Sequence, residues 1–248
     1  MLNLNITAAS RVGCVRTNNE DMLLVGEWFV RNSKMTTQVK TGNTDRYLLA
    51  LADGMGGHNS GEVASSDVLH NLQFFFNDIP AGLAPGEFNE AIYEWLQSIN
   101  TVIDSKGHSD PKYRDMGTTL VAFAYYAGQF YWMNCGDSRL YRLHDGQLSQ
   151  LTTDHSLSNL LGSTKHSNVI TNCIGGGCKT SYIDMVRCTD EVLPGDVFLL
   201  CSDGLNDMIS DADIAQLLVR GHDAQALCDA AEEAGGADNV STIVVRIE

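Results

Sequence analysis

The sequence predicts an α+β fold in which antiparallel β-sheets form a central sandwich with helices on the outside. Two helical segments lie in the first half of the chain, and short β segments separated by Gly and Asp turns dominate the rest. These β segments follow one another in runs, whereas a doubly wound fold would alternate strands with helices. With 248 residues, 44% of them apolar, the chain suits a single domain over residues 1–248.

The amino-terminal half contains three predicted strands and two predicted helices. The strands are expected at residues 3–9, 22–29 and 46–52. The third is continuously apolar and bounded by turn signals, which is typical of a fully buried strand. Apolar residues then recur at helical spacing over about 60–77 and again over 88–104, so both segments are expected to be amphipathic helices.

The second half is rich in β-forming residues. Predicted strands lie in "TTLVAFAYYAG", "QFYWMNCG", "SRLYRLHDGQLSQL", "DMVRC", "DVFLLCSDG" and "NVSTIVVRI". Asp145-Gly146 in "LHDGQL" predicts a two-residue hairpin turn. Two further helices are expected between residues 205 and 235.

Composition excludes several classes of partner. The formal net charge of −15 argues against nucleic acid, because binding it requires clustered Lys and Arg. An anionic substrate would also need imported positive charge, for which divalent cations are the obvious source. No window reaches the roughly 18 apolar residues of a membrane span, and the first ten residues lack the features of a secretory signal. We therefore expect a cytoplasmic monomer that contacts no membrane.

The seven cysteines are odd in number and show no paired spacing. In a chain of this size they are best interpreted as buried, reduced thiols. Cys173 and Cys178 are too far apart for a zinc knuckle, and no second pair of ligands follows them. A cysteine-based tyrosine phosphatase is excluded, since no cysteine has an arginine six positions later.

Carboxylates stand at the ends of several predicted strands. Asp53 and Asp203 each follow a buried strand and precede a glycine, while Asp238 opens the last strand. Glu20 and Asp21 directly precede the second strand. One Asp-Gly pair is ordinarily a turn. Several acids brought to one place would repel each other unless cations joined them, and oxygen ligands suit Mg²⁺ or Mn²⁺.

The segment directly after Asp53 is unusually rich in glycine. Four of the eight positions from 54 to 61 are glycine, which enters sterically tight conformations without a Cβ penalty. The pattern indicates an acid held at a strand end, with bare backbone around it so that a ligand can approach closely.

Seven motifs appear in an order that identifies a resemblance: "RTNNED", "LADGMGGHNSGE", "DMGTTLVAF", "NCGDSRLYRL", "LTTDHSL", "LLCSDGLND" and "ADNVSTIVV". The chain resembles metal-dependent protein phosphatases of the PPM family, also called the PP2C type, and its "DGMGGH" is similar to the bacterial serine/threonine enzymes. The resemblance implies a four-layer αββα sandwich flanked by antiparallel helix pairs. It also implies hydrolysis of phosphoserine and phosphothreonine by a metal-bridging hydroxide, without a phosphoenzyme.

The resemblance assigns a binuclear Mn²⁺ or Mg²⁺ centre. Asp53 would bridge the two ions, and the Gly54 carbonyl would complete one shell. The remaining ligands would form two pairs, Asp203 with Asp238 on one ion and Glu20 with Asp21 near the other, partly through water.

Further residues receive roles from the same resemblance. Arg16 matches the phosphate-binding arginine, whose guanidinium fork grips two oxygens at once; Arg11 has no such match and is expected at the surface. Asp115 is the candidate ligand of a third metal ion, with Asp110 as a nearby alternative. Asn239 is expected to support Asp238 and its loop.

The general acid is not assigned by the resemblance. Eukaryotic members carry a histidine two residues after the bridging aspartate, where this chain has Met55. His58 on the glycine-rich turn is a candidate general acid. A structural hydrogen-bonding role for His58 and a metal-bound water as the acid are the alternatives.

Two other segments match family motifs. Asp137 and Arg139 are expected to brace a turn. Residues 154–177 correspond to a substrate-facing flap that is short here, without an acidic helical insertion. We expect protein-substrate selectivity in this flap. A compact flap would suit a dedicated partner, such as a cognate serine/threonine kinase or its targets.

Two other function classes compete with the enzyme. A two-metal nuclease would share the carboxylates but should carry more basic surface. A catalytically weak or inactive relative that binds phosphoproteins or regulates a partner would ordinarily have lost a metal ligand, whereas all the predicted acids are present. The sequence therefore favours the phosphatase.

Overall fold

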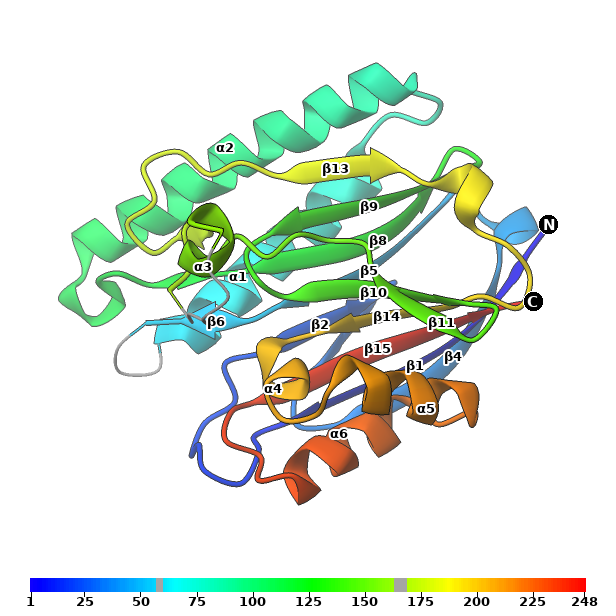
Figure 1. Ribbon diagram of the computed structural model, residues 1–248. Coiled ribbons are helices and arrows are strands. Elements are labelled where there is room, and N and C mark those ends of the chain that lie inside the picture. Colours follow the sequence, from blue (N-terminus) through cyan, green and yellow to red (C-terminus); the bar gives the residue numbers. More distant parts are fainter. Residues whose placement is uncertain (57–59, 163–168) are drawn as a thin grey trace.

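Two six-stranded antiparallel sheets lie face to face at the centre of the computed structural model, which describes residues 1–56, 60–162 and 169–248 (Figure 1). The first sheet has the order β11-β10-β14-β15-β1-β4. Its strands are β1 (Asn3–Arg11), β4 (Lys34–Lys40), β10 (Arg139–His144), β11 (Gln147–Gln150), β14 (Val197–Cys201) and β15 (Val240–Ile247).

The second sheet has the order β13-β9-β8-β5-β2-β3. Its strands are β2 (Met22–Val25), β3 (Trp28–Val30), β5 (Arg46–Ala52), β8 (Leu120–Tyr126), β9 (Gln129–Cys135) and β13 (Asp184–Arg187). A small three-stranded sheet continues beyond the end of β5 in the order β12-β7-β6. It consists of β6 (Gly54–Met55), β7 (Gly117–Thr118) and β12 (Ile174–Gly175).

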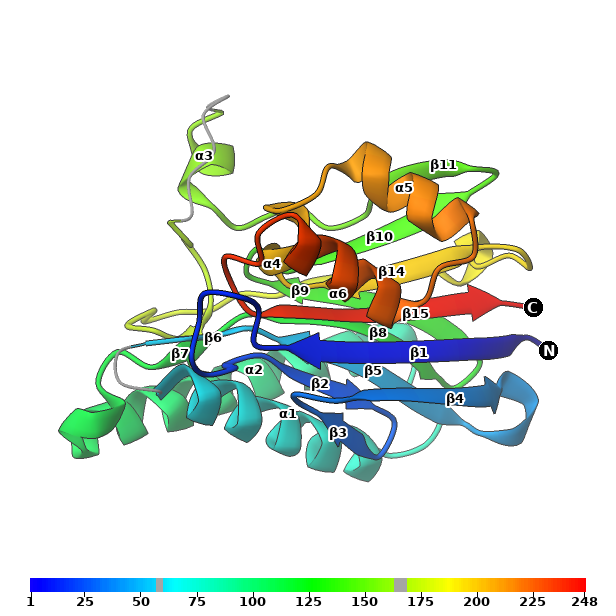
Figure 2. The same ribbon diagram turned by 90° about the horizontal axis from the view of Figure 1, so that it is seen from below.

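Helices cover the outer face of each large sheet (Figures 1 and 2). The second sheet is covered by the long helices α1 (Ser60–Asp78) and α2 (Pro85–Ser109). The first sheet is covered by α4 (Asp203–Asn206), α5 (Asp211–Val219) and α6 (Ala224–Glu233). The remaining helical segments are α3 (Leu157–Leu160) and three 3₁₀ turns at Thr41–Asn43, Pro111–Tyr113 and Thr189–Glu191. In the described part of the chain, no helix has both the length and the apolar character needed to cross a membrane.

The alternation of side chains along the strands produces the four layers. In β5, Leu49 and Leu51 pack between the two sheets, whereas Leu48 packs beneath α1 and α2. In β14, Phe198 belongs to the core between the sheets and Leu199 packs against α5 and α6. Because consecutive strand residues point to opposite faces, continuously apolar strands can fill two cores at once.

The structure confirms the predicted α+β sandwich with flanking helix pairs and refines its elements. The predicted strand at 22–29 is instead two strands, because Gly26 has a φ of +61° and turns the chain between β2 and β3. The edge strand β4 is absent from the prediction, since its polar sequence buries no residue completely. The hairpin turn is confirmed, as Asp145 and Gly146 both have positive φ angles of 48° and 78°.

Strand pairing decides which chain ends meet. In the second sheet Met22 pairs with Ala52, so the residues just outside β2 and β5 lie side by side. In the first sheet Cys201 pairs with Thr242, which brings the end of β14 to the start of β15. Since Ser202 also contacts Asp21, the five predicted acids (Glu20, Asp21, Asp53, Asp203 and Asp238) lie at one end of the sandwich.

Candidate metal centre

A hydrogen bond links the acidic ends of the two sheets. The Ser202 hydroxyl, just after β14, donates to Asp21 Oδ2 over 2.8 Å, and Asp21 directly precedes β2. Asp203 follows Ser202 as the first residue of α4. The carboxyl of Asp53 lies close enough to that of Asp203 to lower the pKa of Asp203. The structure thus brings together acids from both sheets.

Asp21 is completely buried, with no solvent-exposed surface. The pKa of its carboxyl is raised to about 7, mainly by burial and also by the charges of Asp203 and Asp238, against the opposing effect of the hydroxyls of Ser241 and Ser202. Within the described residues, Asp21 Oδ1 is a buried oxygen with no hydrogen-bond partner. An unpartnered carboxylate oxygen at this depth is one that a cation would satisfy.

The backbone of Asp53 is fixed by β7 and the residue that follows it. The Asp53 carbonyl accepts hydrogen bonds from Thr118 Oγ1 over 2.8 Å and from the Thr119 amide over 2.9 Å. Burial raises the pKa of the Asp53 carboxyl well above its usual value, and the nearby Asp21 and Asp203 raise it further. Thr118 and Thr119 begin the predicted strand "TTLVAFAYYAG", and they also hold the backbone of the predicted bridging aspartate.

Asp203 and Asp137 have similarly perturbed carboxyls. Burial, followed by the charge of Asp238, raises the pKa of Asp203 to about 6. Burial and the charge of Asp203 raise the pKa of Asp137 to about 7. We expected Asp137 to brace a turn, but its carboxyl also belongs to this acidic group. A signal for it was present, because Asp137 follows the apolar strand β9 as Asp53 follows β5.

Asn239 ties the loop that carries Glu20 to the start of β15. Its Oδ1 accepts a hydrogen bond from the Glu20 amide over 2.8 Å, and its Nδ2 donates to the carbonyls of Val12 and Asn18. Its own amide donates to Asp238 Oδ1 over 2.8 Å. Burial raises the pKa of the Glu20 carboxyl, and the charge of Arg16 opposes that rise.

Arg16 lies at the exposed edge of the acidic group. Its guanidinium forms an ion pair of 2.6 Å with Asp238, and its side chain is 55% exposed. This hydrogen bond is the main reason that the pKa of Arg16 is raised. Arg11 instead pairs with Asp229 and Glu232 on α6, outside the acidic group, as expected for a surface residue.

Arg31 connects the loop that carries Glu20 and Asp21 to the start of α1. This residue was not identified from the sequence. Its Nε donates to the Asp21 carbonyl over 2.7 Å, and its other nitrogens donate to Glu62 and to the Ser65 hydroxyl. That hydroxyl donates in turn to the Glu20 carbonyl. No local pattern distinguishes Arg31, because its partners are distant in the sequence.

Two glycines allow β6 to lie directly on the start of α1. The Gly54 amide donates to the Glu20 carbonyl over 3.2 Å. A Cβ on Gly54 would lie 2.1 Å from the Gly61 carbonyl oxygen, and a Cβ on Gly61 would lie 2.6 Å from the Gly54 carbonyl carbon. Part of the glycine-rich pattern is therefore explained by close backbone packing beside Asp53.

The chemistry of these side chains fits hard divalent cations. The convergent groups offer only oxygen atoms, one of which is buried without a partner. Among the described residues, no three Asp, Glu, His or Cys side chains are arranged so as to enclose one ion. Mg²⁺ and similar ions retain several waters and need only one or two carboxylates each, so an open set of ligands suits them.

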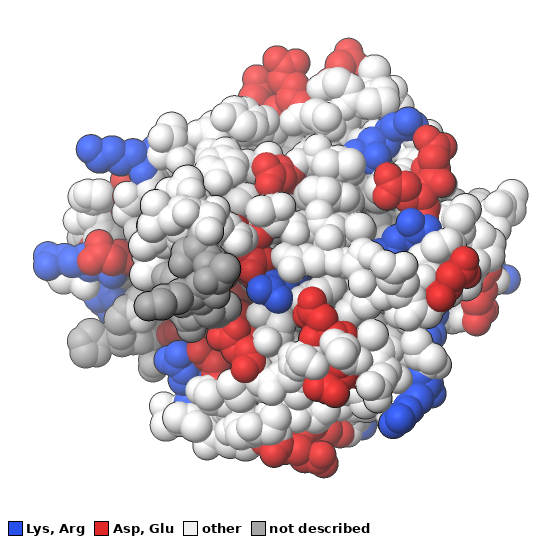
Figure 3. All heavy atoms as spheres, viewed as in Figure 1, with Lys and Arg blue, Asp and Glu red and all other residues white. Residues whose placement is uncertain are grey.

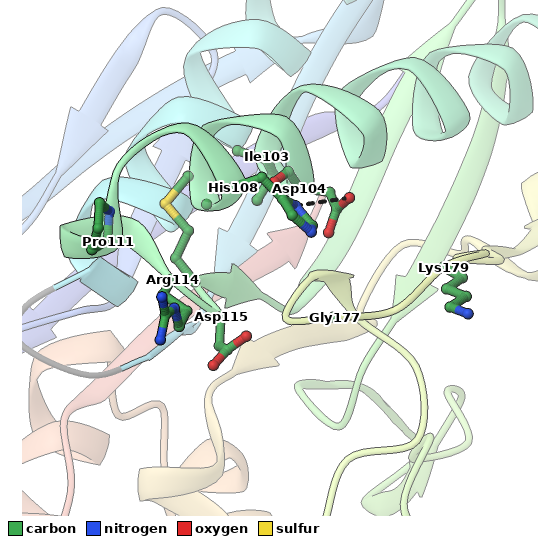
Figure 4. A pocket seen from close by; sticks show the side chains of 10 residues that line it. Ile103, Asp104, His108, Pro111, Arg114, Asp115, Gly177 and Lys179 are labelled. Carbon is green, nitrogen blue, oxygen red and sulfur yellow. Dashed lines mark hydrogen bonds and ion pairs between the residues drawn. The ribbon is translucent and has the colours of Figure 1, made fainter.

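Asp115 lines a cavity of about 530 Å³ (Figure 4). The cavity is lined by the end of α2 together with Arg114, Met116, Gly177 and Lys179. The Asp115 side chain is exposed and its φ is +58°. Its role as a third-metal ligand stays a prediction, while the alternative Asp110 caps a 3₁₀ turn.

The ends of the predicted flap are anchored to the sandwich. Arg139 forms a two-pronged ion pair with Asp154, with contacts of 2.6–3.1 Å, so it braces the start of the flap. His155 accepts from the Gly136 amide and contacts Asp184 over 3.0 Å. His58, the candidate general acid, and residues 163–168 in the middle of the flap lie outside the residues that the structure describes.

Acidic side chains are distributed over the face shown in Figure 3, and several gather beside the residues drawn in grey. The chain has 31 Asp and Glu against 16 Lys and Arg, so its net charge opposes the binding of a phosphate group unless positive charge is added.

Comparisons with known proteins agree on one family. The model of the family described as "Protein phosphatase 2C" matches residues 36–234. The chain is 32% identical over 254 residues to the serine/threonine protein phosphatase PstP of Mycobacterium tuberculosis, covering 98% of this chain but only 45% of PstP. It thus spans about half the length of that relative.

Solved structures give the same result. The Streptococcus agalactiae serine/threonine phosphatase is 30% identical and superimposes with a TM-score of 0.83, over 99% of this chain and 100% of that one. The catalytic domain of PstP, solved with two manganese ions, is 32% identical with a TM-score of 0.76, over 100% of this chain and 99% of that one.

Proposed function

Because the chain belongs to the protein phosphatase 2C family, we propose that it is a metal-dependent phosphatase that hydrolyses phosphoserine and phosphothreonine in proteins. The convergence of buried and half-buried acids from both sheets carries this proposal. Asp21, Asp53 and Asp203 each have a raised pKa, mainly because of burial, and the charge of Asp203 adds to the rise at Asp21 and Asp53. Such a concentration of negative charge is poorly suited to a phosphate ester unless cations are bound.

The cofactors are two Mn²⁺ or Mg²⁺ ions, and the manganese-containing PstP structure supports this assignment. Asp53 would bridge the ions, with the carbonyl of Gly54 on one shell. The other ligands would be Asp203 and Asp238 on one ion, and Glu20 and Asp21 near the other. When bound, the ions supply an activated water and neutralise phosphoryl oxygens.

The residues of the chain orient the substrate and the ligands. Arg16 would grip the phosphate at the exposed edge of the site, since its guanidinium already reaches the acidic group. Thr118 and Thr119 fix the bridging aspartate through its backbone. His58 is the proposed general acid and Asp115 the proposed ligand of a third ion.

The domain and its partners are proposed on the same basis. Residues 1–248 would form one phosphatase domain, since the strands of the two sheets share the core between them. The short flap at 154–177 would select among phosphoprotein substrates and contact a cognate serine/threonine kinase or its targets. The protein would act as a monomer in the cytoplasm.

Hydrolysis of p-nitrophenyl phosphate tests the proposal. We expect activity with Mn²⁺, none with EDTA, and a large loss of activity in Asp203→Asn, because that substitution removes the charge of one proposed metal ligand. Activity that survives chelation would reject the two-metal centre. Inactivity with every divalent ion would favour a phosphoprotein-binding module, and a phosphopeptide panel in which tyrosine is preferred would reject the serine/threonine assignment.

A further inference from the structure

Two cysteines at the end of the flap lie within contact distance. Cys173 Sγ and Cys178 Sγ are 3.4 Å apart, and both cysteines are free thiols. A disulfide requires about 2.05 Å between the sulfurs, so a modest movement would join them. The proposed phosphatase chemistry uses neither thiol.

The intervening turn brings the two thiols together. Gly175, Gly176 and Gly177 all have positive φ angles, of 75°, 60° and 78°. Glycine adopts this conformation without strain, so the chain reverses within four residues and can adjust as the sulfurs approach. The short separation therefore follows from the backbone of the turn.

The side chain of Asn100 on α2 holds the turn in place. Its Oδ1 accepts a hydrogen bond of 2.7 Å from the Gly175 amide, and its Nδ2 donates to the Cys178 carbonyl over 3.1 Å. The Ser181 hydroxyl also donates to Asn100 Oδ1 over 2.9 Å. These contacts fix the backbone on both sides of the cysteine pair.

The two thiols differ in their access to solvent. Cys178 is partly exposed, whereas Cys173 is 4% exposed and its burial raises the pKa of its thiol. Cys178 is therefore the thiol that an oxidant in solution reaches first, and Cys173 is placed to attack it afterwards.

A metal site is the competing explanation. Cys135 is the nearest candidate for a third ligand, because its charge raises the pKa of Cys173 and that of Cys178 raises the pKa of Cys135. However, Cys135 is buried, and its sulfur accepts a hydrogen bond from Asn172. A closed zinc site needs four ligands. In the described residues no three potential ligands are arranged to hold an ion, so redox chemistry fits this pair better.

We propose that Cys173 and Cys178 form a reversible intrachain disulfide in response to peroxide. The Cys178 thiol loses its proton, and its sulfur attacks one oxygen of hydrogen peroxide, so that the O–O bond breaks and a sulfenic acid forms. The other oxygen leaves as hydroxide and takes up the proton lost by the thiol to become water. The Cys173 thiol then attacks the Cys178 sulfur, forming the S–S bond and releasing a second water. Peroxide gains the two electrons that the two thiols lose, and a dithiol reductant reverses the reaction.

The disulfide would act next to the metal centre. The Gly176 amide donates to the Met116 carbonyl over 2.8 Å, and β12 pairs with β7. Thr118 of β7 binds the Asp53 carbonyl. Gly177 and Lys179 line the cavity beside Asp115 (Figure 4). The disulfide would move the turn as the sulfurs approach from 3.4 Å to about 2.05 Å, and this movement would change the surface that meets a bound protein. This consequence rests on the proposed function, whereas the disulfide itself does not.

Mass spectrometry of the whole protein tests the disulfide directly. The chain is reduced, treated with hydrogen peroxide, alkylated in denaturant and digested with trypsin. The peptide 166–179 contains both thiols and no other cysteine. We expect it to lose two hydrogen atoms and take up no alkyl group, and to regain both thiols with dithiothreitol. Cys178→Ser should prevent this change, whereas Cys14→Ser, at an exposed cysteine elsewhere, should not.

Alkylation of both thiols at a peroxide concentration that oxidises Cys14 would overturn the proposal, as would a bond that joins either cysteine to another one. With wild-type protein we also expect oxidation to lower kcat/KM for a phosphopeptide at least threefold, reversibly, and to affect p-nitrophenyl phosphate less. An unchanged kcat/KM in fully oxidised protein would reject the effect on catalysis. Inactivity of the reduced protein would reject the proposed function, and the peptide mass would still decide the disulfide.

Discussion

Asp21 has the least solvent contact of the predicted carboxylate ligands, and its energetics follow from that position. It is fully buried, and one of its oxygens has no hydrogen-bond partner in the described part of the chain. Its pKa of about 7 lies above the unfolded value of 3.8. The folded protein therefore binds more protons than the unfolded chain between these values.

The stability that protonated Asp21 contributes is fully present below about pH 4 and is lost as the pH rises through about 7. At about 1.4 kcal/mol per pKa unit, the loss is on the order of 4 kcal/mol in metal-free protein. We expect the melting temperature in EDTA to fall from pH 5 to pH 8, and Asp21→Asn to flatten that fall. Equal slopes for both proteins in thermal melts would show that Asp21 is not the titrating group.

The side chain of Asn239 is predicted to support metal binding. Its side chain connects Glu20, Val12 and Asn18 to the start of β15. Removing such a support typically weakens metal binding about 10–100-fold. Asn239→Ala should raise the Mn²⁺ concentration for half-maximal activity at least about tenfold, with a smaller change in kcat at saturating Mn²⁺.

The matched control is Asn5→Ala, which removes only a hydrogen bond to Gln38 on the neighbouring strand. Its Mn²⁺ activation curve should overlay the wild type. If Asn239→Ala lowers kcat but leaves the activation constant unchanged, the positioning of Glu20 by Asn239 is wrong.

At the scale of elements, the packing of β6 on α1 depends on two glycines. Alanine normally stabilises a helix relative to glycine by about 0.5–1 kcal/mol. Gly61 is the second residue of α1, but a Cβ there would lie 2.6 Å from the Gly54 carbonyl carbon. We expect Gly61→Ala to destabilise the protein by about 1–3 kcal/mol through overpacking, and to lower activity by displacing Gly54 beside Asp53.

Gly86 provides the comparison, since it is the second residue of α2 and a Cβ there would meet nothing within 4 Å. Gly86→Ala should be neutral or stabilising by up to about 1 kcal/mol. Urea unfolding of both variants measures the difference. Similar stabilities for the two would contradict the backbone contact between β6 and α1.

At the scale of the whole molecule, the net charge of −15 is coupled to metal binding. A ligand that binds only the folded state at 100 times its Kd stabilises by about 2.7 kcal/mol, which corresponds to about 5–10 °C in a chain of this size. We expect Mn²⁺ to raise the melting temperature by this amount, and Asp203→Asn to remove most of the rise.

Asp145→Asn is the control for this effect, because it removes one negative charge in an exposed hairpin turn far from the acidic group. Its response to Mn²⁺ should match that of the wild type. An equal loss of response in both variants would mean that Mn²⁺ acts through general charge screening and not through a specific centre.

The sequence alone predicted much of the architecture, for local reasons. Alternating and continuous apolar runs indicate which faces of a strand are buried, so they predicted the antiparallel sandwich. Apolar residues at helical spacing predicted the helices that cover it. The acids at the ends of β5 and β14 were visible as single residues that interrupt apolar runs. The order of the motifs was sufficient to indicate the family.

The tertiary structure decided how these parts meet. Pairing of Met22 with Ala52 and of Cys201 with Thr242 brings the acidic ends together, and no local pattern contains that information. The same holds for the burial of Asp137 beside Asp203, which depends on the packing of one sheet on the other. Periodicity describes the environment of each residue along one element, whereas distances between elements follow from the order of the strands and the packing of the two sheets.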